Sequence, residues 1–242
     1  MRALILTHFF YSHPGPVAER LLAHGFELDE QLVVPREQIP SPNVHFDFPS
    51  PHDYDVLVVL GSHWGVWQDD VIGNWLLPEL EWMREAVQSD VPVLGICFGG
   101  QLMARALGGS VAPGPRGEFG WTTVMTDDES VVSSGPWFEY HNDRWTLPAG
   151  VREVARSPLA SQAFTVQRSL AVQFHPEVDA AVLAEWFAQG TGELESHGFN
   201  PAVMTAHTEQ INADARARTF ALVDGFLERA GLLSADRDRA EF

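Results

Sequence analysis

One stretch, residues 91–109, constrains the fold of this chain more than any other part of the sequence. It begins with an apolar run at 91–96, typical of a buried strand, and continues into helix-forming residues that end at the glycine pair 108–109. Between them lies Gly95-Ile-Cys97-Phe-Gly99, with the only cysteine among 242 residues. Flanking glycines leave room for a sharp strand-to-helix turn, as in the nucleophile elbow that usually carries serine. The stretch therefore predicts an α/β fold with a thiol at the corner.

The predicted corner places the thiol of Cys97 at the N-terminus of a helix. Peptide dipoles aligned along the helix favour negative charge at this end, so they favour the thiolate, which is the nucleophilic form. A lone cysteine before a helix is more often a small buried hydrophobic residue. Position alone therefore leaves both a catalytic and a structural role open for Cys97.

The sequence before this stretch alternates between strand and helix patterns. Apolar runs at 3–7, 26–34 and 55–60 predict strands, and the runs at 17–24 and 75–88 predict helices. This order predicts a doubly wound, mostly parallel sheet flanked by helices. Five prolines between residues 35 and 52 argue against a long helix or a central strand there, so we expect a surface connection.

The sequence after residue 109 changes to short apolar runs separated by turns. We expect these runs to form an antiparallel extension of the same core, because no linker precedes them. The chain as a whole, 1–242, is predicted to form a single domain. The strands expected in the extension are 122–125, 130–132, 151–156, 163–166 and 170–174.

The last part of the chain, 191–242, is predicted to be a C-terminal helical extension, after a helix at 179–189. Its main helix covers 201–231 and carries an apolar stripe that packs back on the core. The charged end at 234–242 is expected to fray. The stripe consists of Val203, Ile211, Phe220, Leu222, Val223, Phe226 and Leu227.

Charge and cysteine content restrict the classes of partner. With 33 acidic residues against 15 lysines and arginines, the formal net charge is −18, which argues against a basic patch for nucleic acid or an anionic membrane. One cysteine excludes an internal disulfide framework and suits a reducing compartment. No signal peptide is visible, and no apolar run approaches the ~20 residues of a membrane span. We expect a soluble, cytoplasmic protein without nucleic-acid or membrane partners.

A second group of chemically useful residues lies at Val172-Gln-Phe-His175-Pro-Glu177. Side chains two apart in an extended segment point to the same side, and Pro176 biases His175 toward extended geometry. Glu177 can therefore orient the imidazole of His175, as the acid of a catalytic triad orients its base. Taken by itself, the segment also fits an ordinary loop at a strand end.

One further loop leaves a predicted strand at the edge where the elbow lies. The strand at 55–60 runs into Gly61-Ser-His-Trp64, and in an open parallel sheet the loops at the carboxyl ends of strands form the site.

No His-x-x-x-His pair with a glutamate between and no cysteine cluster is present, so we expect no metal. No phosphate-binding glycine loop is present either, and we expect no cofactor.

These motifs together resemble the class I (triad-type) glutamine amidotransferases, in particular free-standing proteins similar to the glutaminase domain of GMP synthetase. The resemblance rests on Gly95-x-Cys97-x-Gly99-x-Gln101 followed by Gln173-Phe-His-Pro-Glu177, and extends over about residues 3–190. It implies a flavodoxin-like fold. Further matching segments are 61–64, 118–121 and 140–143.

The resemblance implies a role for each matching residue. The nucleophile that forms a thioester with the carboxamide of glutamine would be Cys97, with His175 as general acid and base and Glu177 as its orienting acid. Backbone N–H groups next to the nucleophile and in the third-strand loop would bind the oxyanion. The implied oxyanion residues are Phe98, Gly61 and Ser62, and the implied substrate-binding residues are Gln101, His141 and Tyr140.

The substrate and the fate of the ammonia leave alternatives open. A class I amidotransferase passes ammonia to a synthetase, and residues 179–242 are too short for one, so we expect a separate synthetase subunit or a stand-alone hydrolase. This chain has Gly61-Ser62-His63 where many members have Gly-Gly-Pro, and Trp64 and Trp67 follow. The first alternative is therefore a hydrolase of γ-glutamyl amines or peptides. The second is a catalytically silent regulatory subunit, against which the intact triad residues argue.

Overall fold

The computed structural model describes residues 1–233, without the side chain of Glu193. The segment 234–242, which we predicted to fray, lies outside the described residues. Within 1–233, nine strands form one sheet in the order β2-β1-β3-β4-β9-β8-β7-β5-β6. The strands are β1 Arg2–Thr7, β2 Glu27–Leu32, β3 Val56–Val59, β4 Val93–Ile96, β5 Ser110–Thr126, β6 Gly135–Thr146, β7 Arg152–Arg156, β8 Ser161–Val166 and β9 Ser169–Val172.

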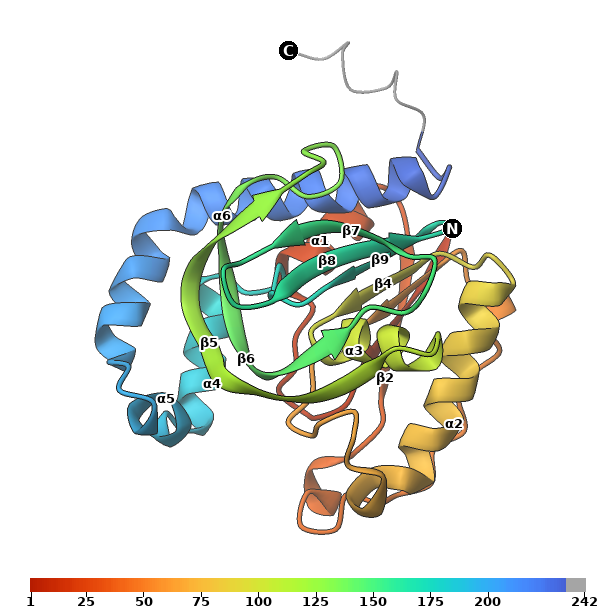
Figure 1. The fold of residues 1–242 in the computed structure, drawn as a ribbon, viewed down its shortest axis with the longest axis horizontal. Coiled ribbons are helices and arrows are strands. Elements are labelled where there is room, and N and C mark those ends of the chain that lie inside the picture. The colour runs from red at the N-terminus through yellow and green to blue at the C-terminus, as the bar shows by residue number, and fades with distance from the viewer. Residues whose placement is uncertain (234–242) are drawn as a thin grey trace.

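Helices cover both faces of this sheet, as the β-α-β pattern predicted. In Figure 1, α6 (blue) runs across the upper side of the molecule and α2 (gold) lies at its lower right. The α-helices are α1 Gly15–Ala23, α2 Asp69–Gln88, α3 Phe98–Ala106, α4 Ala180–Gln189, α5 Gly192–Ser196 and α6 Pro201–Arg229. The predicted surface connection at 35–52 contains the 3-10 turn η1, Arg36–Gln38, and borders a second, η2, Pro51–Asp53.

The inner strands of the parallel half, β1, β3, β4 and β9, are buried on both sides because nearly all of their residues are apolar, whereas the edge strand β2 is mostly polar and partly exposed. Leu4 and Leu6 of β1 pack in the cluster that contains α2 and α3 residues. Ala3 and Ile5 alternate with them and pack in the cluster that contains α1 and α6 residues. β2, β1, β3, β4 and β9 pair in parallel. The doubly wound α/β prediction is therefore confirmed.

The antiparallel extension is confirmed in type, but its strands differ from the predicted ones. β5 and β6 form a long hairpin, whereas we predicted a strand at 130–132 and none at 135–146. Prolines and glycines between 110 and 118 concealed the start of β5, and the β5–β6 register shifts there, between Pro113 and Glu118. Residues 130–132 form a turn: Val131 and Val132 are buried in the core, and their N–H groups donate to Asp128.

The helix predicted at 201–231 is α6, but most of the apolar residues that it turns toward the core lie in its C-terminal half, with Met204 as a buried exception near its start. Phe226 is fully buried between the sheet and α1, with other apolar residues of the last two turns. In contrast, Val203 is 66% exposed. Ion pairs also connect α6 to neighbouring helices: Arg20 of α1 donates two hydrogen bonds to Asp224, at 2.7 and 2.6 Å. The predicted stripe was therefore wrong at its N-terminal end.

Replacing Phe226 with alanine is expected to lower the free energy of unfolding by about 3–5 kcal/mol, because the change opens a cavity in a fully buried cluster. Val203→Ala is the matched control and is expected to change it by less than about 0.5 kcal/mol. Chemical denaturation of both variants measures the difference. Similar losses in the two variants would contradict the assignment of the core face. The single-domain organisation of 1–242 stays a prediction.

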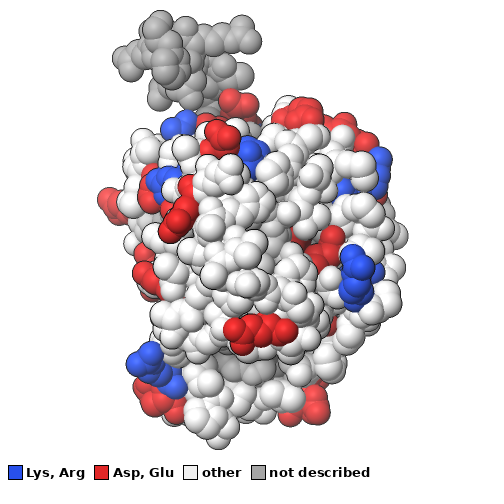
Figure 2. Space-filling model, turned by 90° about the vertical axis from the view of Figure 1, so that its left-hand side faces the viewer, with Lys and Arg blue, Asp and Glu red and all other residues white. Residues whose placement is uncertain are grey.

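On the face shown in Figure 2, acidic side chains are spread among a larger area of uncharged residues, with few lysines and arginines. In residues 1–233, no helix combines the length and the apolar character needed to cross a bilayer.

Candidate active site

The corner between β4 and α3 has the backbone of a strained turn. Cys97 has φ +50° and ψ −102°, a conformation that side chains rarely adopt and that persists only where the surrounding packing imposes it. Its N–H donates to the carbonyl of Val172 at 2.8 Å, which ties the corner to β9. A Cβ on Gly99 would lie 2.2 Å from the carbonyl oxygen of Val59, so only glycine lets α3 approach the sheet here. The elbow predicted from the sequence is therefore present.

The imidazole of His175 lies beside this corner because β9 is the neighbour of β4. Ile96 pairs with Val172, so the residues after each strand emerge at the same edge. Nδ1 of His175 donates to Oε1 of Glu177 at 2.6 Å, which leaves Nε2 as the other ring nitrogen. An ideal Cβ on Gly61 would lie 3.1 Å from Cε1 of His175 and 3.8 Å from the Cβ of Cys97. The fold thus brings thiol, imidazole and carboxylate together at Gly61.

The charges around His175 favour its protonated form. Burial lowers the pKa of the imidazole, but the nearby charges of Glu177 and Cys97 outweigh it, so the pKa stands well above its ordinary value. Nε2 is buried and has no hydrogen-bond partner among residues 1–233. Trp186 of α4 packs its ring at 88° to the imidazole, with centroids 5.2 Å apart, and so restricts its orientation. Trp186 carried no signal in the sequence beyond the helix pattern.

A cavity of about 540 Å³ opens over this group. It is lined by residues of the loops after β1, β3, β4 and β9 and by residues of β6. Its walls therefore come from segments far apart in the sequence. Every residue that we predicted for the site lines it: Cys97, His175, Glu177, Phe98, Gly61, Ser62, Gln101, His141 and Tyr140.

The backbone around the cavity offers donors for an oxyanion. Phe98 is the first residue of α3, where N–H groups lack an intrahelical partner. Among the described residues, the N–H groups of Phe98, Gly61 and Ser62 have no hydrogen-bond acceptor. The Oγ of Ser62 accepts from the N–H of Trp64 at 3.3 Å, which holds the loop after β3 in a turn.

Replacing Gly61 with alanine is expected to reduce kcat by about 10²-fold with little change in stability, because the added methyl group would press on the ring of His175. Gly73→Ala is the matched control, since a Cβ there meets nothing closer than Leu77 at 3.9 Å. Steady-state kinetics and thermal melting of both variants make the comparison. Unchanged kcat in Gly61→Ala would show that the close approach to His175 does not matter.

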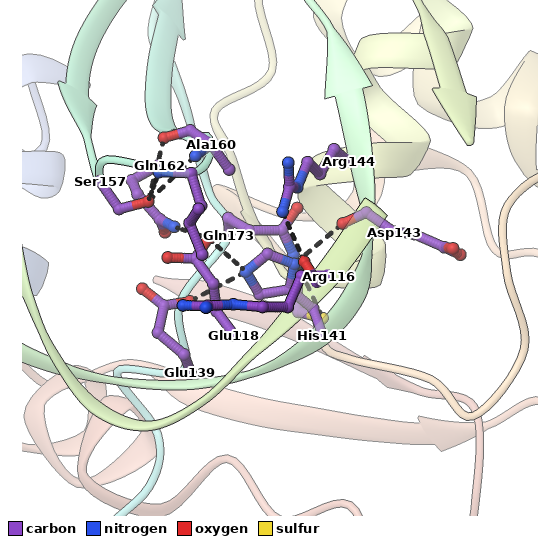
Figure 3. A network of polar contacts seen from close by, with 12 residues as sticks. Arg116, Glu118, Glu139, His141, Asp143, Arg144, Ser157, Ala160, Gln162 and Gln173 are labelled. Atoms are coloured by element: carbon purple, nitrogen blue, oxygen red, sulfur yellow. Dashed lines mark hydrogen bonds and ion pairs between the residues drawn. The ribbon is translucent and has the colours of Figure 1, made fainter. Parts of the chain in front are cut away.

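The ring of His141 is turned into a buried pair of carboxylates, an arrangement that the sequence did not predict. Nε2 lies 3.3 Å from Oε2 of Glu118 and 3.2 Å from Oε2 of Glu139, and Nδ1 donates to the carbonyl of Asp143 at 2.9 Å. Figure 3 shows the cluster, with both glutamates beside the ring. The three side chains are almost fully buried. The ring of Tyr140 lies instead against Phe119, with centroids 5.3 Å apart.

The two carboxylates keep this imidazole charged. Burial lowers the pKa of His141, but its contacts with Glu118 and Glu139 outweigh the burial and raise that pKa to about 10. Burial raises the pKa of Glu139 to about 7, because the carboxylate is completely enclosed. Glu139 follows no motif that we identified, and only the β5–β6 register places it near Glu118.

The mouth of the cavity is aromatic. The indole N–H of Trp67 donates to Oδ2 of Asp143 at 2.9 Å, and the hydroxyl of Tyr11 contacts Nε2 of His63. Trp64 lines the cavity and also packs on Trp75, with ring centroids 5.9 Å apart. Trp64 and Trp67, which follow Gly61-Ser62-His63 in the sequence, thus form part of the cavity wall. In the described part of the chain, no group of three histidine, cysteine or acidic residues has metal-binding geometry.

Comparison with known proteins supports the resemblance noted in the sequence. Residues 73–188 match the family described as glutamine amidotransferase class-I. The chain is 42% identical to GMP synthase [glutamine-hydrolyzing] of Nitrobacter hamburgensis over 143 residues, which is 52% of this chain and 26% of the relative. It is also 42% identical to the same enzyme of Bartonella henselae over 150 residues, 55% of this chain and 28% of the relative. The chain thus matches about a quarter of the length of these relatives.

Solved structures show the same fold. A glutamine amidotransferase from Thermotoga maritima has a TM-score of 0.81 at 23% identity, with 94% of this chain and 98% of that one covered. Another from Methylobacillus flagellatus has a TM-score of 0.79 at 20% identity, covering 100% and 98%. The chain thus has the fold of class I glutamine amidotransferases, and its residues 73–188 match the model of that family.

Proposed function

We propose that this chain hydrolyses the side-chain amide of glutamine through a thioester on Cys97 and releases glutamate and ammonia. The observation that carries the proposal is the meeting of thiol, imidazole and carboxylate beside Gly61, at the wall of one cavity. The relatives from N. hamburgensis and B. henselae are glutamine-hydrolysing enzymes, which supports glutamine as the substrate.

The chemistry has two halves that use the same three residues. In the first, the thiolate of Cys97 attacks the carboxamide carbon, and His175 donates the proton of Nε2 to the departing nitrogen, which leaves as ammonia. In the second, His175 takes a proton from water, the resulting hydroxide attacks the thioester, and Cys97 leaves as thiolate with glutamate. Glu177 holds the ring in one orientation and stabilises its charge throughout.

Each tetrahedral intermediate carries a negative oxygen that needs donors in place beforehand. The N–H of Phe98 is one such donor, and the N–H of Gly61 or Ser62 is the other. A preorganised donor of this kind is worth about 3 kcal/mol of transition-state stabilisation. Gln101 and Tyr140, which line the same cavity, would contact the amino-acid end of the substrate. The part of the cavity wall that contains His141 would also contact the amino-acid end of the substrate.

A second candidate function is hydrolysis of γ-glutamyl amines or peptides, in which the scissile carboxamide is the same and the leaving group is larger. The cavity volume favours this candidate, because about 540 Å³ lies within the ~300–1,000 Å³ of pockets that enclose drug-sized ligands. The rings of Tyr11, Trp67, Trp186 and Phe187 are among its walls. A catalytically silent regulatory role remains the third candidate, and the close contact of the triad residues argues against it.

The ammonia produced from glutamine is best used by a synthetase, because free ammonia is largely protonated near neutral pH and then no longer attacks. We therefore propose delivery to a synthetase partner. A chain that serves such a partner would hydrolyse glutamine slowly by itself, since docking completes many sites of this kind.

The experiment that separates these candidates is a glutamate-release assay on the purified chain. The substrates are glutamine and a panel of γ-glutamyl amines with small, alkyl and aromatic leaving groups, and Cys97→Ala is the control. Glutamine hydrolysis that disappears in the control supports the proposal. Rapid hydrolysis of a γ-glutamyl amine with negligible action on glutamine would overturn it in favour of the stand-alone hydrolase. No thiol-dependent hydrolysis of any substrate, and no labelling of Cys97 by a glutamine analogue, would favour the silent subunit.

A further inference from the structure

The fully buried side chain of Gln173 lies behind the nucleophile, between β9 and α3. Residues alternate in direction along a strand, so Gln173 points to the same face as Ala171, which is the face covered by α3. Its Nε2 donates to the sulfur of Cys97, with 3.6 Å between the two atoms. Gln173 is 0% exposed and contributes nothing to the cavity wall. It therefore touches the reacting sulfur without reaching the space for substrate.

The polarity of this amide is set by a chain of hydrogen bonds that ends on a backbone carbonyl. Oε1 of Gln173 accepts from Nε2 of Gln101 at 3.2 Å, and the same Nε2 donates to the carbonyl of Asp143 at 3.4 Å. A carbonyl can only accept, so the amide of Gln101 cannot be reversed. Reversing Gln173 alone would bring its NH₂ against that of Gln101. The side of Gln173 that faces Cys97 is therefore the donor.

The carbonyl of Asp143 is itself held from the other side. Nδ1 of His141 donates to it at 2.9 Å, and the carboxylates of Glu118 and Glu139 lie on the opposite edge of the ring. Figure 3 shows Gln173 and Asp143 on either side of His141. A carbonyl can only accept, so Nδ1 of His141 must carry the proton of this hydrogen bond. The buried cluster of β5 and β6 thus fixes the position of the acceptor on which the two glutamines are aligned.

We propose that Gln173 is a further catalytic residue, whose amide stabilises the thiolate of Cys97 through a hydrogen bond, and that Gln101, Asp143 and His141 position it. This proposal deepens the proposed function and rests on it for its catalytic meaning. A hydrogen bond to an ionised group is stronger than one to a neutral group, so it favours the thiolate over the thiol. The charged groups that interact with the sulfur are His175 and His141. Each is paired with carboxylates, His175 with Glu177 and His141 with Glu118 and Glu139.

The test is the pH dependence of alkylation of Cys97 by iodoacetamide in the free protein, followed by mass spectrometry. The variant is Gln173→Met, which keeps the length of the side chain and removes the donor. We expect the midpoint of the profile to move up by about one pH unit. With glutamine as substrate, we expect kcat to fall about tenfold while KM changes less than twofold, because Gln173 does not reach the cavity. Gln88→Met, at an exposed position at the end of α2, is the control. It should change neither the alkylation midpoint nor kcat.

Two further measurements keep the proposal open to contradiction if Gln173→Met does not fold. Gln173→Glu is isosteric and replaces the donor with an acceptor, so its alkylation midpoint should lie above that of the unmodified protein. In the unmodified protein, the side-chain amide resonance of Gln173 should shift with pH at the same midpoint as alkylation, and the shift should be absent in Cys97→Ala.

A profile of Gln173→Met that superimposes on that of the unmodified protein would overturn the proposal and leave Gln173 as packing. A Gln173 amide resonance whose chemical shift does not change when Cys97 ionises would also overturn it. Because alkylation needs no substrate, the outcome is independent of the proposed function. If the alkylation profile of Gln173→Met is shifted but the chain does not hydrolyse glutamine, the role of Gln173 in stabilising the thiolate is upheld. Glutamine is then rejected as the substrate.

Discussion

Cys97→Ala is expected to lower the turnover of glutamine by at least about 10⁴-fold, since removing the nucleophile of a covalent mechanism leaves only the contributions of binding and the oxyanion donors. The variant should remain folded, because Cys97 is a small buried residue whose replacement by alanine removes one atom. Glutamate release and thermal melting measure the two effects. Activity within about tenfold of the unmodified chain would exclude a covalent role for Cys97.

The same residue is expected to react once per chain with a chloroketone analogue of glutamine. The chain has no other cysteine, so Cys97→Ala is an internal control that lacks every thiol. Free glutamine should protect Cys97 if it occupies the same cavity. A protein that resists labelling under conditions that label an authentic glutaminase would contradict the proposal at its first step.

His175→Ala and Glu177→Ala are expected to have unequal effects. Loss of the base should be nearly as severe as loss of Cys97, because nucleophile and base act as a unit. Loss of Glu177 should cost about ten- to a hundredfold less, since Trp186 still packs on the ring at 5.2 Å and limits its orientation. Steady-state and single-turnover kinetics compare the variants. Equal and mild losses would mean that the His-Pro-Glu segment is structural.

Glu177→Gln separates the electrostatic part of this effect from the geometric part. The charge of Glu177 helps to raise the pKa of His175 well above its ordinary value, so removing the charge lowers that pKa. The proton that His175 donates to the departing ammonia would then be lost at lower pH. The basic limb of the pH–rate profile should therefore move to lower pH in this variant. If the basic limb does not move in Glu177→Gln, a group other than His175 is responsible for it.

The candidate site residues that could be predicted from the sequence are those whose placement depends on local backbone geometry. Glycines around Cys97 predicted a strained turn because few other residues fit one, and the structure shows φ +50° at Cys97. The separation of His175 and Glu177 predicted their contact, because alternate side chains of an extended segment share a side. The structure shows this contact as a hydrogen bond of 2.6 Å.

The residues that could not be predicted depend on pairing between distant segments. Glu139 meets His141 and Glu118 only through the register of β5 and β6, and the proline- and glycine-rich start of β5 hid that hairpin. Gln173 meets Cys97 only because β9 is inserted next to β4. Trp186 meets His175 only because α4 folds back over the end of β9.

The sequence by itself determined the α/β core, the elbow and the orienting pair, because hydrophobic period and glycine placement act over a few residues. The tertiary structure alone decided which buried polar groups surround the thiol. A buried carboxylate or amide is tolerated only where partners satisfy it, and for Glu139 and Gln173 those partners come from other strands and helices. The polar environment of Cys97 and His175 is therefore a property of the assembled sheet.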